Sequence, residues 1–365
     1  MNLHYLKLAF VLFNLNYYCK GSPFPPTNSS WFDIGPVVLP TEPWEGTAVQ
    51  EPQVYWDVYQ QEFRMYYRGG WGNQSVGVAT SKTGITWKKY EHNPIYGSGG
   101  SNIEGLNEGG QPFVFREGID KYWLYTTAPG RMNIAISEDG YTWTTQNSTI
   151  KLPDGCTLWG NRVVWTEQHD VTNKNNVKIK VKTYYMLQDS GWKDGVWKIF
   201  LYTSNDSLSW QIDNYGNELA SLQIGLGDGM FGGVSFANIN GTISAKNASG
   251  FYNLWYHASP ASNTPTVLPT DIYHAASKDL ITWKISLCES PVLKHSGKGA
   301  EYDQTADPSP IITPDGGAYL YYDGDNNVST AKRHASIGMA IAKSDPDIPD
   351  RAPKFFETSV TIDLL

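Results

Sequence analysis

The chain has little cysteine, little arginine and no apolar run long enough to cross a bilayer. Three cysteines in 365 residues exclude a small disulfide-stapled domain, and no spacing indicates a cysteine-ligated metal centre. Seven arginines and a net charge of −8 exclude the basic patch that a nucleic-acid-binding protein needs. No convincing amphipathic helix is visible. We therefore expect no nucleic-acid partner and no stable membrane insertion.

The N-terminal segment resembles a signal peptide. Lys7 precedes a short apolar stretch, Leu8–Leu15, which is followed by Gly21 and Ser22. This order predicts that residues 1–21 are removed and that the protein is secreted. Export would place the chain where N-glycans are added in a eukaryote. The N-x-S/T sequons that support this lie at Asn28, Asn73, Asn147, Asn205, Asn240, Asn247 and Asn327.

One short pattern occurs four times. It reads SKTGITW at Ser81–Trp87, SEDGYTW at Ser137–Trp143, SNDSLSW at Ser204–Trp210 and SKDLITW at Ser277–Trp283. A degenerate fifth copy begins at Ser344. Each copy follows an aromatic-rich run and then an alternating run of small and apolar residues, which are strand signals. Its Ser and Asp side chains suit a tight turn, so the interpretation of these boxes is structural.

These repeats predict the fold. One more short strand precedes each aromatic run, which gives about four antiparallel strands per repeat and an all-β, five-bladed β-propeller. We expect a single domain over residues 31–365, with blades at about 51–95, 108–153, 158–222, 232–297 and 301–350. Whether Cys156 and Cys288 pair stays open, although they follow blades that are not neighbours in the ring.

The first residues of the innermost strands surround the axis of a propeller. Glu51, Gln111 and Asp307 each precede a proline at this place, and Asn161 occupies it in blade three with Arg162 beside it. A residue before proline is held extended. We therefore expect these side chains to point consistently at the axis.

The repeats, the sequences EPQV at 51–54 and DPSPI at 307–311, and the SxDGxxW turns resemble the five-bladed propeller glycosidases. These are the arabinanases and β-xylosidases of glycoside hydrolase family 43 and the invertases and levansucrases. The resemblance covers about residues 33–350 and implies three axial carboxylates: a base or nucleophile, a residue that tunes its pKa, and an acid. This sequence departs from that pattern, with Glu51 where Asp is usual and with Gln111 and Asn161 at the other two places. The invertase WMNDPNG and RDP motifs are absent.

A glycosidase needs one charged and one protonated carboxyl group across the scissile bond. We predict Glu51 and Asp307 as this pair, because blades one and five become neighbours when the ring closes. Glu108 is a further candidate general acid. Substrate contacts are expected from Gln111, Asn161, Arg162, Trp71, Trp159, Arg68, His257 and Asp303. No cofactor is expected, and a structural Ca²⁺ or Na⁺ ion in the axial channel is left open.

The leading interpretation is a secreted glycoside hydrolase acting on a poly- or oligosaccharide that contains arabinose, xylose or fructose. The alternative is a non-catalytic carbohydrate-binding propeller, because the amides of Gln111 and Asn161 keep hydrogen bonds but cannot transfer protons. A sialidase would need six blades and an arginine triad, and a glycoside phosphorylase would need a basic phosphate pocket. The scarcity of arginine disfavours both.

Overall fold

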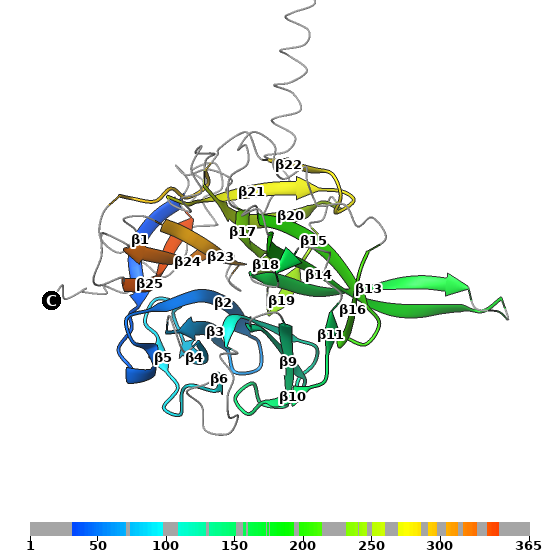
Figure 1. The fold of residues 1–365 in the computed structure, drawn as a ribbon, viewed down its shortest axis with the longest axis horizontal. Coiled ribbons are helices and arrows are strands. Elements are labelled where there is room, and N and C mark those ends of the chain that lie inside the picture. Colours follow the sequence, from blue (N-terminus) through cyan, green and yellow to red (C-terminus); the bar gives the residue numbers. More distant parts are fainter. Residues whose placement is uncertain are drawn as a thin grey trace, which may run out of the picture.

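A computed structural model describes residues 31–70, 74–97, 109–128, 131–150, 156–157, 160–172, 174, 176–192, 197–213, 231–239, 241–246, 250–259, 269–285, 291–297, 304–312, 317–326 and 334–342. In this part of the chain, five sheets surround a central axis (Figure 1). The protein is therefore an all-β, five-bladed propeller, as the repeats predict. The expected signal peptide and the degenerate box at Ser344 lie outside the described residues. Within them, no helix combines the length and apolar character that a membrane span requires.

The blades follow one another along the chain. From the axis outward, blade one contains β2 (Val49–Asp57), β3 (Glu62–Gly69), β4 (Ser75–Ser81) and β5 (Lys88–Lys89), with β6 (Tyr96–Gly97) beside β4. Blade two contains β7 (Gly110–Arg116), β8 (Tyr122–Ala128), β9 (Arg131–Ser137) and β10 (Thr144–Gln146). Blade three contains β13 (Arg162–Thr172), β14 (Lys178–Trp192), β15 (Trp197–Ser204) and β16 (Ser209–Ile212), with β11 (Thr149–Ile150) and β12 (Cys156–Thr157) at its margins.

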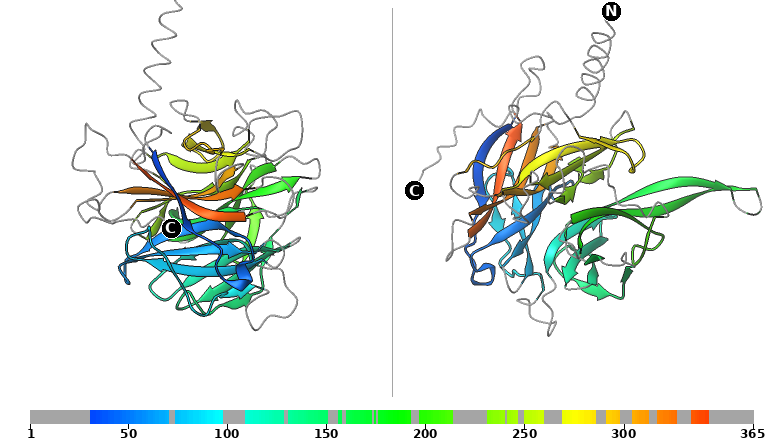
Figure 2. Two further views of the ribbon diagram at one scale, coloured as in Figure 1. Left: turned by 90° about the vertical axis from the view of Figure 1, so that its left-hand side faces the viewer. Right: turned by 45° about the horizontal axis from the view of Figure 1, so that its top comes forward.

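Blade four contains β17 (Phe231–Ser235), β20 (Tyr252–Ala258), β21 (Asp271–Ser277) and β22 (Trp283–Ile285). Blade five contains β23 (Gln304–Ile312), β24 (Ala318–Asn326), β25 (His334–Ala342) and β1 (Trp31–Val38), with the hairpin β18 (Ala237–Ile239) and β19 (Thr242–Ser244) against β23. A short 3-10 helix, η2 (Pro43–Glu45), precedes blade one. β13 and β14 continue outward as a ribbon that projects from the propeller (Figure 2).

The N-terminal strand closes the ring. β1 pairs antiparallel with β25, so the outermost strand of blade five comes from the opposite end of the chain (Figure 2). Trp31 is buried there and packs edge-on against Trp255, with ring centroids 5.9 Å apart. Closing a propeller with strands from both ends ties blade five to the start of blade one, which fixes those blades as neighbours.

The Ser/Asp boxes form the turns between the third and fourth strands. In blade two, Ser137 Oγ accepts the Gly140 N–H at 2.8 Å, and Asp139 Oδ1 accepts two further backbone N–H groups at 2.7 Å. The same bonds recur at Ser204 and Asp206 and at Ser277 and Asp279. The indole of each box tryptophan in blades one, three and four donates to the carbonyl three residues earlier. These side chains are thus occupied in turn formation.

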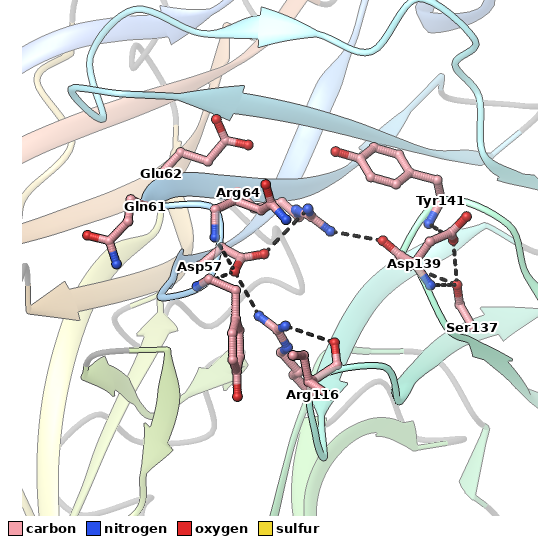
Figure 3. Close-up of polar contacts among 12 residues, drawn as sticks. Asp57, Gln61, Glu62, Arg64, Arg116, Ser137, Asp139 and Tyr141 are labelled. Atoms are coloured by element: carbon pink, nitrogen blue, oxygen red, sulfur yellow. Dashed lines mark hydrogen bonds and ion pairs between the residues drawn. The ribbon is translucent and has the colours of Figure 1, made fainter.

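The charged residues that adjoin the blade-two box are paired with one another (Figure 3). Arg64 of β3 donates to the Asp139 carbonyl at 3.2 Å and lies 3.4 Å from Asp57. Asp57 also accepts a hydrogen bond of 2.9 Å from Arg116 of blade two. Asp57 ends β2, so this cluster lies at the end of the inner strand opposite Glu51. It joins blades one and two and does not contribute to the axial site.

A buried histidine makes the fold sensitive to acid. His274 of β21 packs against Trp255, with ring centroids 5.2 Å apart, and both ring nitrogens are buried without a partner among the described residues. Burial lowers the pKa of His274 from 6.5 to about 4. The unfolded chain therefore binds a proton that the folded chain resists, so stability is present above about pH 6.5 and falls as the pH drops towards 4.

We expect protonation of this residue alone to lower the free energy of unfolding by about 3 kcal/mol at pH 4. Urea denaturation of the wild type and His274→Phe at about pH 7.5 and pH 4 measures the effect. The free energy of unfolding of the variant, taken relative to that of the wild type, should rise by about 3 kcal/mol in acid. His92→Phe, at an exposed histidine, is the control. The same difference in free energy of unfolding between variant and wild type at both pH values would contradict the assignment.

Candidate active site

The inner strands of four blades carry a β-bulge at the same place. The antiparallel register shifts between Gln50 and Gln53 in blade one, and the shift recurs at the matching positions of blades two, four and five. The bulge residues have left-handed backbone conformations: Glu51 (φ 54°), Gln111 (φ 50°), Gly233 (φ 64°) and Asp307 (φ 49°). Blade three has no such shift.

The expectation of an extended backbone at Glu51, Gln111 and Asp307 is therefore wrong. A bulge inserts one extra residue and re-aims its side chain, and a left-handed residue accommodates it. The local preference imposed by the following proline is overridden by this pairing. Each non-glycine residue held with positive φ costs about 1–3 kcal/mol, so the axial ends of three inner strands carry backbone strain.

A second tier of side chains comes from the second strand of each blade. Arg68, Thr127, His257 and Asp323 pair in register with the residue directly before a bulge. In blade three the corresponding residue is Asp189, whose N–H donates to the Asn161 carbonyl at 3.1 Å. Each blade therefore contributes one residue from its inner strand and one from its second strand to the same end of the propeller.

Hydrogen bonds link the axial residues of the inner strands from blade to blade. The Gln111 N–H donates to Glu51 Oε2 at 2.7 Å, and the Gly160 N–H donates to Gln111 Oε1 at 2.7 Å. Asn161 Nδ2 then donates to Asp307 Oδ1 at 2.5 Å. These bonds connect blades one, two, three and five. The Asn161 amide holds the Asp307 carboxylate, whereas the Gln111 amide accepts a backbone N–H of blade three and the Gln111 backbone N–H holds Glu51.

Blade four is joined to blades three and five through hydrogen bonds of Gly233 and His257. The Gly233 N–H donates to Asp189 Oδ2 at 2.6 Å, and the Asp307 N–H donates to His257 Nδ1 at 3.1 Å. His257 Nδ1 also lies 3.2 Å from Asp307 Oδ1. A Cβ at Gly233 would stand 2.5 Å from His257 Nδ1 and 2.7 Å from Asp307 Oδ1. Only glycine therefore fits at this bulge.

Two buried arginines neutralise part of the acidic charge. Arg68 lies 3.2 Å from Glu51 Oε1 and donates to Gln50, whose amide donates to Asp323 Oδ2 at 2.7 Å. These contacts join blade one to blade five. They place a guanidinium beside one of the two predicted catalytic carboxylates.

Arg162 is buried more deeply and binds several acceptors. Its guanidinium donates to Gln188 Oε1 at 2.7 Å, to the carbonyls of Gln111 at 3.0 Å and Gly160 at 2.8 Å, and to Thr127 Oγ1. Burial lowers the pKa of Arg162 to about 10, so the side chain remains a cation at neutral pH. Its engagement on all sides makes it a support for the site and leaves it little freedom to contact a substrate.

The carboxyl groups of the site differ in their affinity for protons. Burial, together with the charge of Asp307, raises the pKa of Glu51 to about 7 against the opposing effect of Arg68. Burial and the charge of Asp307 also raise the pKa of Asp189 and Asp323 well above the usual range. Asp307 is the common neighbour whose negative charge disfavours ionisation of the other three. Neighbouring carboxyl groups that differ in their affinity for protons are the arrangement that acid–base chemistry requires.

The structure brings together seven of the residues predicted from the sequence: Glu51, Asp307, Gln111, Asn161, Arg162, Arg68 and His257. Glu108, Trp71, Trp159 and Asp303 lie outside the described residues. Sequence reasoning missed Asp189 and Asp323. Asp323 directly follows the aromatic run Tyr319–Tyr322 of a second strand, as Arg68 and His257 follow theirs, so the same rule applied to blade five would have found it. Asp189 lies three residues beyond the run Thr183–Met186, so that rule would not have found it. No group of three or more His, Cys, Asp or Glu side chains in the described ranges could hold a metal ion.

No protein-family model matches the sequence, and no curated protein matches it. Its structure is similar to that of a Bombyx mori GH32 β-fructofuranosidase (TM-score 0.54, 13% identity), covering 89% of this chain and 65% of that one, just under two thirds of its length. It is also similar to an endo-arabinase from Bacteroides thetaiotaomicron (TM-score 0.50, 14% identity), covering 84% of this chain and 98% of that one. A third match is an N-acetylgalactosamine deacetylase from F. plautii in complex with blood group B trisaccharide (TM-score 0.54, 14% identity), covering 86% of this chain and 95% of that one. At these identities the likeness establishes the fold alone, the five-bladed propeller.

Proposed function

We propose that this protein is a secreted glycoside hydrolase in which Glu51 donates a proton and Asp307 acts as the charged carboxylate. The observation that carries the proposal is the placement of these two groups on equivalent bulges of neighbouring blades. Their environments separate their roles, since the charge of Asp307 contributes to a pKa of about 7 for Glu51. A general acid works best when its pKa lies near the working pH.

The reaction follows from this pair. Glu51 transfers its proton to the glycosidic oxygen as the bond to the anomeric carbon breaks, and it becomes a carboxylate next to Arg68. Asp307 stabilises the opposite side of the sugar, either by attacking the anomeric carbon or by activating a water molecule. Asn161 and His257 hold Asp307 in place. Asp189 acts through Gly233, whose backbone it fixes against His257.

The proposed substrate is a poly- or oligosaccharide containing arabinose, xylose or fructose. The similar solved structures include a β-fructofuranosidase and an endo-arabinase, and these support a furanose-containing substrate in particular. Secretion and N-glycosylation remain part of the proposal. Asn147 and Asn205, the two sequons that fall within the described residues with their side chains, are exposed and open to modification.

A hydrolysis screen tests the proposed function. Purified protein is incubated with arabinan, xylan and inulin oligosaccharides and with the corresponding aryl glycosides, and released sugars are separated by chromatography. We expect turnover on one sugar class. Binding without turnover on any of them would instead support the non-catalytic carbohydrate-binding propeller.

The pH dependence of the reaction tests the role of Glu51. Since the acid must be protonated, kcat/KM should be highest below about pH 7 and fall tenfold per pH unit above it. The fall of kcat/KM above about pH 7 should disappear in Glu51→Gln, whose residual rate should not vary over this range. A wild-type rate that instead rose through pH 7 would assign Glu51 the role of a base.

A further inference from the structure

Blade four carries a second histidine–carboxylate pair farther from the axis. Asp271 opens β21, and its Oδ1 accepts the backbone N–H of His295 at 2.8 Å and lies 2.7 Å from His295 Nδ1. The Asp271 side chain is 7% exposed, whereas the His295 imidazole is 20% exposed. One buried carboxylate oxygen therefore fixes both the backbone and the ring of a histidine that solvent can reach.

This pair lies at the same end of the propeller as the axial carboxylates. Asp271 is the cross-strand neighbour of Ala258, which directly follows His257. The preceding residue, Thr270, accepts a hydrogen bond of 3.0 Å from Thr305 at the start of β23. β21 is the third strand of the blade, two strand spacings from β17, so the pair stands about 10 Å outward from the inner strand.

The contacts to Asp271 decide which hydrogen bond His295 can offer. A ring that donates from Nδ1 to a carboxylate keeps Nε2 as an acceptor in its neutral form. A fixed acceptor at this end of the propeller suits the hydroxyl group of a neutral sugar, which brings its own donor hydrogen. Since Asp271 is nearly inaccessible, its effect on any ligand passes through the histidine.

We propose that His295, positioned by Asp271, binds a hydroxyl group of a second sugar residue, outward from the one that contacts Glu51 and Asp307. This inference rests on the proposed function and deepens it: the site takes an oligosaccharide, and blade four forms an outer subsite. His295 is a substrate-binding residue and Asp271 a positioning residue. The subsite should discriminate between short and long substrates and leave bond cleavage itself unchanged.

Two substitutions separate a binding role from a structural one. His295→Asn keeps a side-chain donor near the Nδ1 position, and hence the bond to Asp271, but removes the group at Nε2. His295→Gln can place an amide oxygen near the Nε2 position but gives up the bond to Asp271. If His295 binds sugar, the His295→Asn variant should bind the sugar more weakly than His295→Gln does. The His295→Gln variant should have the lower melting temperature of the two.

Binding is measured by calorimetry in the Asp307→Asn background, so that the ligand is not cleaved. The probes are arabinotetraose, xylotetraose and nystose, each beside its monosaccharide, and His92→Asn is the control at an exposed histidine. We expect His295→Asn to weaken tetrasaccharide binding about 3- to 10-fold and to leave monosaccharide binding unchanged.

The inference is overturned if His295→Asn binds the tetrasaccharide as its parent does, or if no tetrasaccharide binds at all. Failure of the proposed function gives a different result, because wild-type protein would then bind the tetrasaccharide without cleaving it. In that case the order of affinities among the His295 variants still decides the subsite.

Discussion

We expect the Asp307→Asn variant to hydrolyse its substrate on the order of 10³-fold more slowly than the wild type. The substitution removes the charge that the reaction uses while keeping an oxygen at the Oδ1 position. That oxygen can still accept the 2.5 Å hydrogen bond from Asn161. The fold should therefore survive, and the loss should appear in kcat with little change in KM.

Single-turnover kinetics and a melting curve measure the two effects on the same preparation. Asp170→Asn, at an exposed carboxylate on the ribbon formed by β13 and β14, makes the same chemical change far from the axis. It should match the wild type in both assays. Retention of full activity by Asp307→Asn would remove this residue from the mechanism.

Replacing Arg162 with methionine should destabilise the protein by about 3–5 kcal/mol. Arg162 is 2% exposed, and its guanidinium binds side chains and carbonyls of blades two and three. Methionine fills much of the volume but leaves those acceptors buried and unpaired. It also removes a cation whose charge favours ionisation of Asp189, so the axial end should take up protons more readily.

Urea denaturation followed by tryptophan fluorescence measures the change in stability. Lys88→Met removes an equal charge from an exposed position on β5 and should shift the midpoint little. Arg162→Lys should recover only part of the loss, because an ammonium group cannot reproduce the planar donor geometry of a guanidinium. A small effect of Arg162→Met would show that the acceptors find other donors.

The Ser/Asp boxes show how well local pattern predicted local structure. Their side-chain oxygens bind backbone N–H groups only two or three residues away, so the sequence contains nearly the whole interaction. The outer strand of blade five is the opposite case. β1 is separated from its partner β25 by almost the entire chain, and nothing in the local pattern of Trp31–Val38 indicates which sheet it joins.

The axial site lies between these extremes. Aligning the repeats placed Glu51, Gln111 and Asp307 at equivalent positions, and the structure gathers them as expected. The same alignment gave the wrong backbone, because a bulge depends on the register with the second strand. Asp189 was missed because its contact with Gly233 joins two blades.

The sequence by itself determined the repeat, the all-β five-bladed fold and the positions that face the axis, because these depend on periodicity and on turns closed by near neighbours. Only the tertiary structure decided which acidic groups meet, how strongly each holds a proton and which groups the amides bind. Gln111 and Asn161 look like lost carboxylates in the sequence, yet they bind the backbone and the carboxylate of neighbouring blades. A pKa near 7 at Glu51 likewise arises from burial and from the charge on Asp307, and both depend on ring closure.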